Sequence, residues 1–153
     1  MSSTGEVACF GENMEEAFLK SLKSSNVPIP DKGSSILICI DDEEKIELVK
    51  RLKNIGYHIN AGNNLSNQIL EENGIITTFI ENNDCDNIKN NKVDLVLDFT
   101  ENSKENYSIR RNAIDYNTSL ITNDEQIKLL VNSIEKNPDI HYKSHCEYFD
   151  DSY

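Results

Sequence analysis

The spacing of hydrophobic positions along this 153-residue chain changes near residue 35. Before that point, apolar residues from Met14 to Leu22 recur at the spacing of one helical face, and Pro28 and Pro30 follow them. After it, short apolar runs alternate with stretches of helical periodicity, which is the pattern of a parallel sheet covered by helices. The sequence therefore predicts a helix and a linker, followed by an α/β domain.

Five apolar segments predict the strands of that domain. The unbroken run at residues 36–40 is typical of a central strand that is buried on both faces. The other predicted strands lie at residues 57–60, 75–80, 94–99 and 119–121.

Periodic segments between the strands predict the helices. Residues 46–55 have an apolar stripe, and residues 106–116 are also expected to be a helix. Ile69 and Leu70 mark a short helix, and a last helix begins after Thr122 or Asn123. The Asn- and Asp-rich segment 81–91 is expected to be a polar loop with one turn of helix. The predicted fold class is α/β, a five-stranded parallel sheet with flanking helices in a flavodoxin-like or Rossmann-like three-layer sandwich.

Composition excludes several classes of partner. The net charge is −12, and the 15 basic residues are scattered among 27 acidic ones, so we expect no nucleic acid partner. No apolar run approaches the ~18 residues of a membrane span, so we expect no membrane partner. The four cysteines are widely separated and favour free thiols. The cluster of His141, His145 and Cys146 has no further ligand motif, so we predict no metal and no cofactor for this chain.

The topology limits where a ligand can bind. In an open parallel sheet, ligands bind beyond the carboxyl ends of the strands where the strand order reverses. The loops at those ends are expected at residues 41–45, 61–66, 98–104 and 122–123. Lys45 lies in the first of them and is interpreted as a surface lysine on an amphipathic helix, with phosphate binding as the alternative.

Two segments carry a family resemblance: STGEV at residues 3–7 and NYSIRR at residues 106–111. In this order they resemble the C-terminal end of the large chain of carbamoyl-phosphate synthases, where STGEV closes the second ATP-grasp unit and a methylglyoxal-synthase-like regulatory domain follows. The resemblance covers residues 2 to 148. It implies that residues 1–32 are the end of an ATP-grasp unit and a linker, residues 33–137 the regulatory domain, and residues 138–153 a polar tail.

The resemblance also implies a function. The whole synthase makes carbamoyl phosphate from ATP, bicarbonate and ammonia or glutamine, for arginine and urea or pyrimidine synthesis, with ATP and Mg as its cofactors. This chain would bind a small anionic effector, N-acetylglutamate or a nucleotide monophosphate, and would not be catalytic alone. ACFGE at residues 8–12, Asn106-Tyr107 and the aromatic tail favour the ammonia-dependent branch of the mitochondrial matrix; the other branches are cytoplasmic.

The effector-binding residues follow from the same resemblance. Relatives carry a Thr-x-Gly-Thr-like loop after the second strand; Gly62 falls on its first threonine, and Asn64 or Ser66 is the candidate for its second. Asp98 and Glu101 fall on two asparagines that hold N-acetylglutamate, and Asn106 matches a third ligand-contacting asparagine. The residues expected at the effector site are Gly62, Asn64, Ser66, Asp98, Glu101, Asn106 and Arg110.

Several alternatives stay open at this point. Arg110 and Arg111 lie ~100° apart on a helix, so only one can face the end of the sheet, and that arginine can pair with Asp94, Asp98 or Asp115 instead of a ligand. Asp98 and Glu101 can be solvated loop acids, or they can repel a dicarboxylate and weaken its binding roughly tenfold to hundredfold.

Three functions are weighed. The first is the regulatory module. The second is a lyase of the methylglyoxal-synthase class, for which Asp98 is the one acid at a suitable strand end. The third is a module whose effector site has decayed and which has a structural role. The apolar face of the first helix, from Met14 to Leu22, is expected to pack against the preceding unit of the synthase.

Overall fold

The protein is described here from a computed structural model that covers residues 6–25, 27–79, 88, 90, 92–100, 104–136, 140–144 and 146–147. Its strands form one sheet in the order β3-β2-β1-β4-β5, and each neighbouring pair is parallel. The strands are β1 (Ser35–Cys39), β2 (His58–Ala61), β3 (Thr78–Phe79), β4 (Leu95–Asp98) and β5 (Ser119–Ile121).

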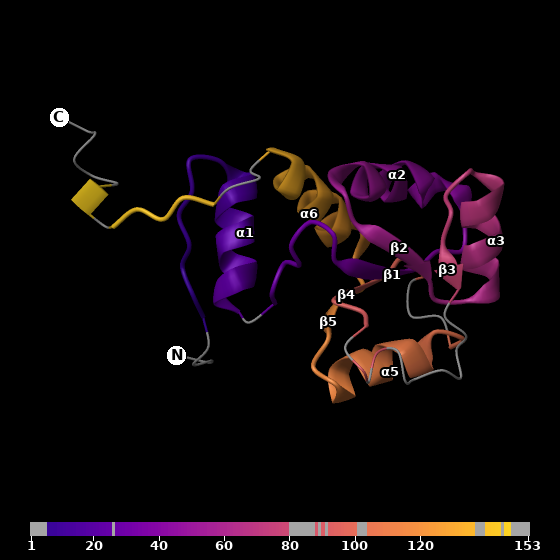
Figure 1. Ribbon diagram of the computed structural model, residues 1–153. Coiled ribbons are helices and arrows are strands. Elements are labelled where there is room, and N and C mark those ends of the chain that lie inside the picture. The colour runs from indigo at the N-terminus through magenta and orange to yellow at the C-terminus, as the bar shows by residue number, and fades with distance from the viewer. Residues whose placement is uncertain are drawn as a thin grey trace.

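Helices cover both faces of this sheet (Figure 1). One face packs on α2, α3 and α6 through the larger hydrophobic core, and the other packs on α5 through a smaller one. The α/β class with a parallel sheet and flanking helices is therefore confirmed. The helices are α1 (Met14–Ser24), the 3₁₀ turn η1 (Glu43–Lys45), α2 (Ile46–Ile55), α3 (Asn64–Glu72), α5 (Tyr107–Asp115) and α6 (Asp124–Lys136).

Strand β1 lies at the centre, as the unbroken apolar run predicts. Successive side chains of a strand point to opposite faces. Ile36 and Ile38 accordingly belong to the larger core, while Leu37 and Cys39 belong to the smaller one, and all four are fully buried. This double burial explains why polar residues are absent from the run.

The edge of the sheet differs from the prediction. The third strand is expected over residues 75–80, but β3 comprises Thr78–Phe79. Ile75 is buried in the larger core before that strand begins, and Ile76 is exposed. The loop expected at residues 81–91 lies outside the described residues, except for Ile88 and Asn90.

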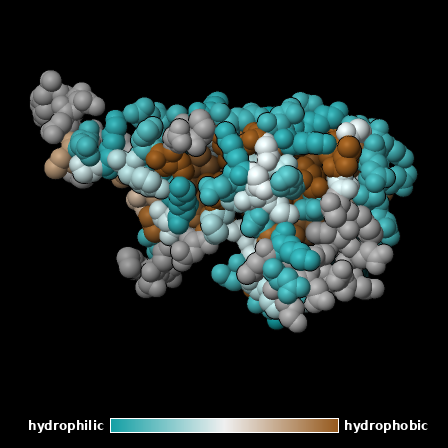
Figure 2. All heavy atoms as spheres, viewed as in Figure 1, coloured by the Kyte–Doolittle hydropathy of each residue, from teal (hydrophilic) through white to brown (hydrophobic). Residues whose placement is uncertain are grey.

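The first helix packs within the chain, which corrects the expectation of an absent partner. Leu19 of α1 is only 2% exposed and belongs to the larger core, and Phe18 and Leu22 pack against it. Helix α1 lies beside α6, and Lys136 of α6 forms an ion pair with Glu15 of α1 (Figure 1). Figure 2 shows hydrophobic side chains gathered over this region, and a second group of them on the other half of the same face.

The described part of the predicted tail also lies against α1. Ile140 packs on the larger core, and the Tyr142 ring lies 6.0 Å from Nζ of both Lys20 and Lys23. Lys143 pairs with Glu12 at 3.0 Å. Residues 140–143 thus lie against α1 and the segment just before it. None of the described helices has the length and apolar character that crossing a bilayer requires.

Candidate functional site

The carboxyl ends of β1, β2 and β4 meet at the point where the strand order reverses, because the chain places β2 on one side of β1 and β4 on the other. The loops that follow β2 and β4 converge there with the start of α5. The side chains of five polar residues are buried there (Asn63, Ser66, Asp98, Thr100 and Asn106), and that of Arg110 is 14% exposed. We call this group the polar cluster; it consists of Asn63, Ser66, Asp98, Thr100, Asn106 and Arg110.

Hydrogen bonds connect the cluster from one loop to the other. Asn63 Nδ2 donates to Asn106 Oδ1 at 2.9 Å, and Asn106 Nδ2 donates to Thr100 Oγ1 at 2.8 Å. Thr100 Oγ1 in turn donates to Asp98 Oδ1 at 2.6 Å. Two side-chain amides, a hydroxyl and a carboxylate therefore form one continuous chain across the edge of the sheet.

Asp98 carries the negative charge of the cluster, and Arg110 neutralises it. Asp98 is the last residue of β4 and is 1% exposed. Its Oδ2 accepts a hydrogen bond from Arg110 NH1 at 2.7 Å. Of the alternatives left open by the sequence, the pairing of Arg110 with Asp98 is the one found. Arg111 points away and pairs with Asp115 at 2.7 Å.

This pairing corrects two expectations for Asp98. The side chain is not a solvated loop acid, because it is buried, and it does not present an uncompensated charge to a ligand, because Arg110 and Thr100 bind both of its oxygens. Glu101, the second acid expected there, lies outside the described residues.

The loop after β2 is held by its own side chains. Asn63 caps α3 by accepting a hydrogen bond from the backbone N–H of Ser66 at 2.7 Å. The Ser66 hydroxyl donates to the carbonyl of Ile40 and accepts from its N–H, both at 2.9 Å. Ser66 thus ties α3 to the end of β1, and its hydroxyl is already engaged. Asn64, the alternative candidate, is exposed outside the cluster.

Gly62 allows this loop to approach the sheet closely. A Cβ atom at this position would lie 2.5 Å from Sγ of Cys39 and 3.1 Å from Cδ1 of Ile109. The position therefore requires glycine for packing, so Gly62 serves to place Asn63 and does not itself supply a binding group. Burial and the nearby Asp98 carboxylate raise the pKa of the Cys39 thiol, which stays protonated at neutral pH.

The sequence analysis missed two members of the cluster, Asn63 and Thr100. Asn63 stands three residues before Ser66 at the start of a helix, the spacing of a side-chain N-cap. Thr100 stands two residues after an aspartate that ends a strand, and both its N–H and its hydroxyl donate to that carboxylate. These local patterns were available in the sequence, but the contact between Asn63 and Asn106 depends on the tertiary fold.

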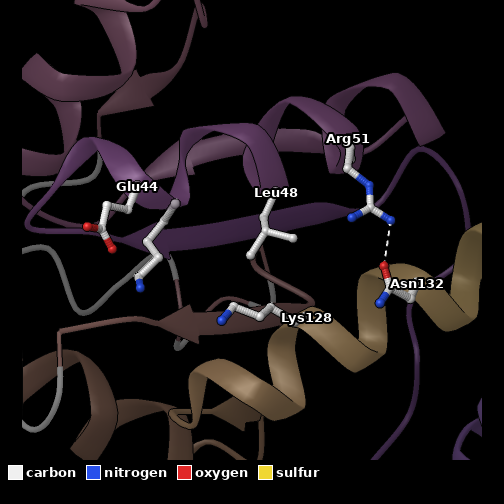
Figure 3. A pocket seen from close by; sticks show the side chains of 6 residues that line it. Glu44, Leu48, Arg51, Lys128 and Asn132 are labelled. Atoms are coloured by element: carbon white, nitrogen blue, oxygen red, sulfur yellow. Dashed lines mark hydrogen bonds between the residues drawn. The ribbon is translucent and has the colours of Figure 1, made fainter.

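Lys45 lies in a different place, between α2 and α6. Its Nζ pairs with Asp124 at 2.8 Å, and this pairing raises the pKa of Lys45. A hollow of about 280 Å³ lies here, and Figure 3 shows Arg51 reaching across it to Asn132. Arg51 also pairs with Glu135, so we assign no site to this hollow. It is lined by Glu44, Lys45, Leu48, Arg51, Lys128 and Asn132.

Within the described residues, no group of three or more His, Cys, Asp and Glu side chains could hold a metal ion. His145 of the sequence cluster lies outside those residues, and Cys146 is exposed.

Known proteins resemble the chain over almost its whole length. It is 33% identical to the multifunctional protein URA2 of Saccharomyces cerevisiae over 90% of the chain and 7% of that protein. It is 34% identical to the carbamoyl phosphate synthase large chain of Clostridium botulinum over 86% of the chain and 14% of that protein. This chain is a homologue of the carbamoyl-phosphate synthases. The mitochondrial, ammonia-type carbamoyl-phosphate synthase of Homo sapiens is 32% identical over 97% of the chain and 11% of its own length.

These relatives of the synthase family are much longer than the chain, which spans 7% to 14% of them. Their identities to the chain lie within two percentage points of one another, so the ammonia-dependent branch stays a prediction. No protein-family model matches the chain.

Proposed function

We propose that this chain is the regulatory, effector-binding domain of a carbamoyl-phosphate synthase and has a methylglyoxal-synthase-like fold. The homology to a small part of several synthases supports this, as does the polar cluster where the strand order reverses, which is where ligands bind in open α/β sheets. The remainder of the synthase would be its partner and would carry out the ATP-dependent synthesis of carbamoyl phosphate, with Mg.

The observation that carries the proposal is the buried hydrogen bond between Asn63 and Asn106. Asn63 caps α3, and Asn106 stands at the N-cap position of α5, although its side chain bonds to the cluster and not to the helix. An effector that takes the place of this mutual bond would contact the starts of two helices, and we expect it to shift them. Such a change at helix ends is a means of coupling the site to the rest of a synthase.

The effector would be N-acetylglutamate or a nucleotide monophosphate, as the family resemblance implies. A response to N-acetylglutamate would favour the ammonia-dependent branch and the mitochondrial matrix, and a response to a nucleotide would favour a cytoplasmic branch. Relatives of the mitochondrial type and of other types are both similar to this chain.

A second candidate function is a structural module whose effector site has decayed. It is favoured by the completeness of the hydrogen bonding, because no buried side-chain nitrogen or oxygen of the described residues lacks a partner. A fully satisfied buried network makes a core rigid without any ligand. The lyase alternative is disfavoured, because Asp98 is buried and paired with Arg110 and so is not placed to remove a proton from a substrate.

Calorimetry with N-acetylglutamate and with uridine monophosphate tests the proposal. We expect one of them to bind, and we expect Asn106→Ala to weaken that binding roughly 5-fold to 150-fold, since it removes a hydrogen-bonding amide worth ~1–3 kcal/mol. Asn64→Ala is the matched control, because Asn64 is exposed in the same region and should leave the affinity unchanged.

Circular dichroism must show that both variants are folded. In the whole synthase, the same Asn106→Ala change should abolish the effect of that ligand on the rate of carbamoyl phosphate formation. Absence of binding by the folded, unmodified chain would favour the structural module. An equal loss of affinity in Asn106→Ala and Asn64→Ala would show that the polar cluster is not the binding site.

A further inference from the structure

The side chain of Asp98 is bound in the way a protein binds a carboxylate ligand. Its Oδ1 accepts from the Thr100 N–H at 3.0 Å and from the Thr100 hydroxyl at 2.6 Å, and its Oδ2 accepts from Arg110 at 2.7 Å. One backbone donor, one hydroxyl and one guanidinium thus surround both oxygens. We call these three donors the carboxylate cradle.

Burial shows that the cradle is occupied and closed. Asp98 has a side-chain exposure of 1%, and the Arg110 side chain has an exposure of 14%. Hydrogen bonds to a charged carboxylate are about twice as strong as neutral ones, and the partners of a buried charge pair are costly to separate. An acid group that arrives from solution therefore has to break this pair before it can use Arg110.

A dissolved anion competes poorly with Asp98 for the carboxylate cradle. The carboxylate is attached to the end of β4 and is held at bonding distance, so its effective concentration at the cradle exceeds that of a dissolved anion. We propose that Asp98 is a specificity-determining residue: it fills the carboxylate cradle from within the chain and excludes the acid group of an effector from Arg110.

This inference rests on the proposed function, because it concerns the effector of the same site, and it limits the class of ligand. The unmodified site takes a molecule that presents neutral hydrogen-bonding groups to the amides of Asn63 and Asn106. An acid group on that molecule lies outside the cradle. Anions are therefore kept from Arg110 because Asp98 already fills the carboxylate cradle, and not because its charge repels them.

Chemical rescue tests the cradle directly. Asp98→Ala removes the carboxyl group and leaves a space bordered by the three donors, and formate has the size and charge to fill it. We expect sodium formate, compared with sodium chloride at equal concentration, to raise the Tm of Asp98→Ala by roughly 3–6 °C when formate is at ten times its Kd. The Tm of the unmodified chain should not respond to formate.

Two matched variants control for general effects of formate. Asp98→Asn keeps the shape of the side chain and fills the same space, so formate should not stabilise it. Asp115→Ala removes the partner of the exposed Arg111 and should not respond either. A folded Asp98→Ala variant with no rise in Tm beyond these controls would overturn the proposal.

A measurement on the unmodified chain covers the case in which Asp98→Ala does not fold. The nuclear magnetic resonance signal of the Arg110 Nε–H group should stay in place as formate is added, because Asp98 holds the guanidinium. A shift of this signal at formate concentrations that leave other arginines unaffected would show that anions reach Arg110, and would refute exclusion by Asp98.

The outcome is separable from that of the proposed function. If formate rescues Asp98→Ala while no effector alters the synthase, the cradle stands and the regulatory role fails. If the synthase responds to an effector through Asn106 while rescue fails, the regulatory role stands and the exclusion by Asp98 is wrong.

Discussion

Single side chains decide how closely the loop after β2 approaches the sheet. An added Cβ at Gly62 would meet Cys39 Sγ at 2.5 Å, so we expect Gly62→Ala to lower the free energy of unfolding by about 1–3 kcal/mol. Urea denaturation measures this. In a Cys39→Ala background the same change should cost about 1 kcal/mol less, because the smaller side chain makes room. Additive effects would show that the new methyl group is accommodated elsewhere.

The sequence predicted where Asp98, Asn106 and Arg110 lie in the fold, but it did not predict which acid pairs with Arg110. Asn106, Asp98 and Arg110 were all expected at the end of the sheet, and the structure brings them together there. The neutralisation of Asp98, however, depends on which of several acids Arg110 of α5 meets in the folded chain. Sequence spacing left three acids possible, and the tertiary fold selects one.

At the scale of the element, α1 behaves as part of the core. Leu19 is 2% exposed, so Leu19→Ala should lower the free energy of unfolding by about 2–5 kcal/mol through the cavity that it leaves. Met14→Ala, on the same helix but 67% exposed, should change it by less than about 0.5 kcal/mol. Equal, small effects would mean that α1 detaches in solution and that the prediction of a separate N-terminal unit was correct.

The elements themselves were largely readable from the sequence because their apolar periodicity is strong. The central strand β1 and helices α2 and α6 lie where the pattern puts them. The extent of β3 could not be predicted from its own sequence, since the length of an edge strand depends on how many of its residues pair with the adjacent strand, here β2. The partner of α1 could not be predicted either, because an apolar helical face does not reveal which surface covers it.

For the whole molecule, thiol labelling gives a readout of global unfolding. Burial and Asp98 raise the pKa of Cys39, so the native thiol is protonated and enclosed, while Cys146 is exposed. We expect a disulfide reagent to label Cys39 at least roughly 100-fold more slowly than Cys146. The measurement is made with Cys9 and Cys85 replaced by serine, so that Cys39→Ala and Cys146→Ser identify the two remaining phases. Comparable rates would mean that the sheet opens locally.

The raised pKa of Cys39 also predicts how the free energy of unfolding depends on pH. The folded state keeps its proton on Cys39 after the unfolded thiol begins to ionise near pH ~8.5. The unfolded state then binds fewer protons, so the free energy of unfolding should fall as the pH rises above this value. Cys39→Ala should lose this component of the pH dependence, and urea titrations at pH 7 and pH 10 would measure the difference.

The contact between α1 and α6 has a mechanical consequence. These helices lie about a hundred residues apart in sequence, yet they pack side by side, and residues 140–143 lie along α1 as well. Tension applied to the two ends of the chain would act first on this helix pair, whose side-chain contacts can be peeled apart a few at a time. The hydrogen bonds between the central strands would bear load only after that, so we expect the polar cluster to stay intact while this helix pair separates.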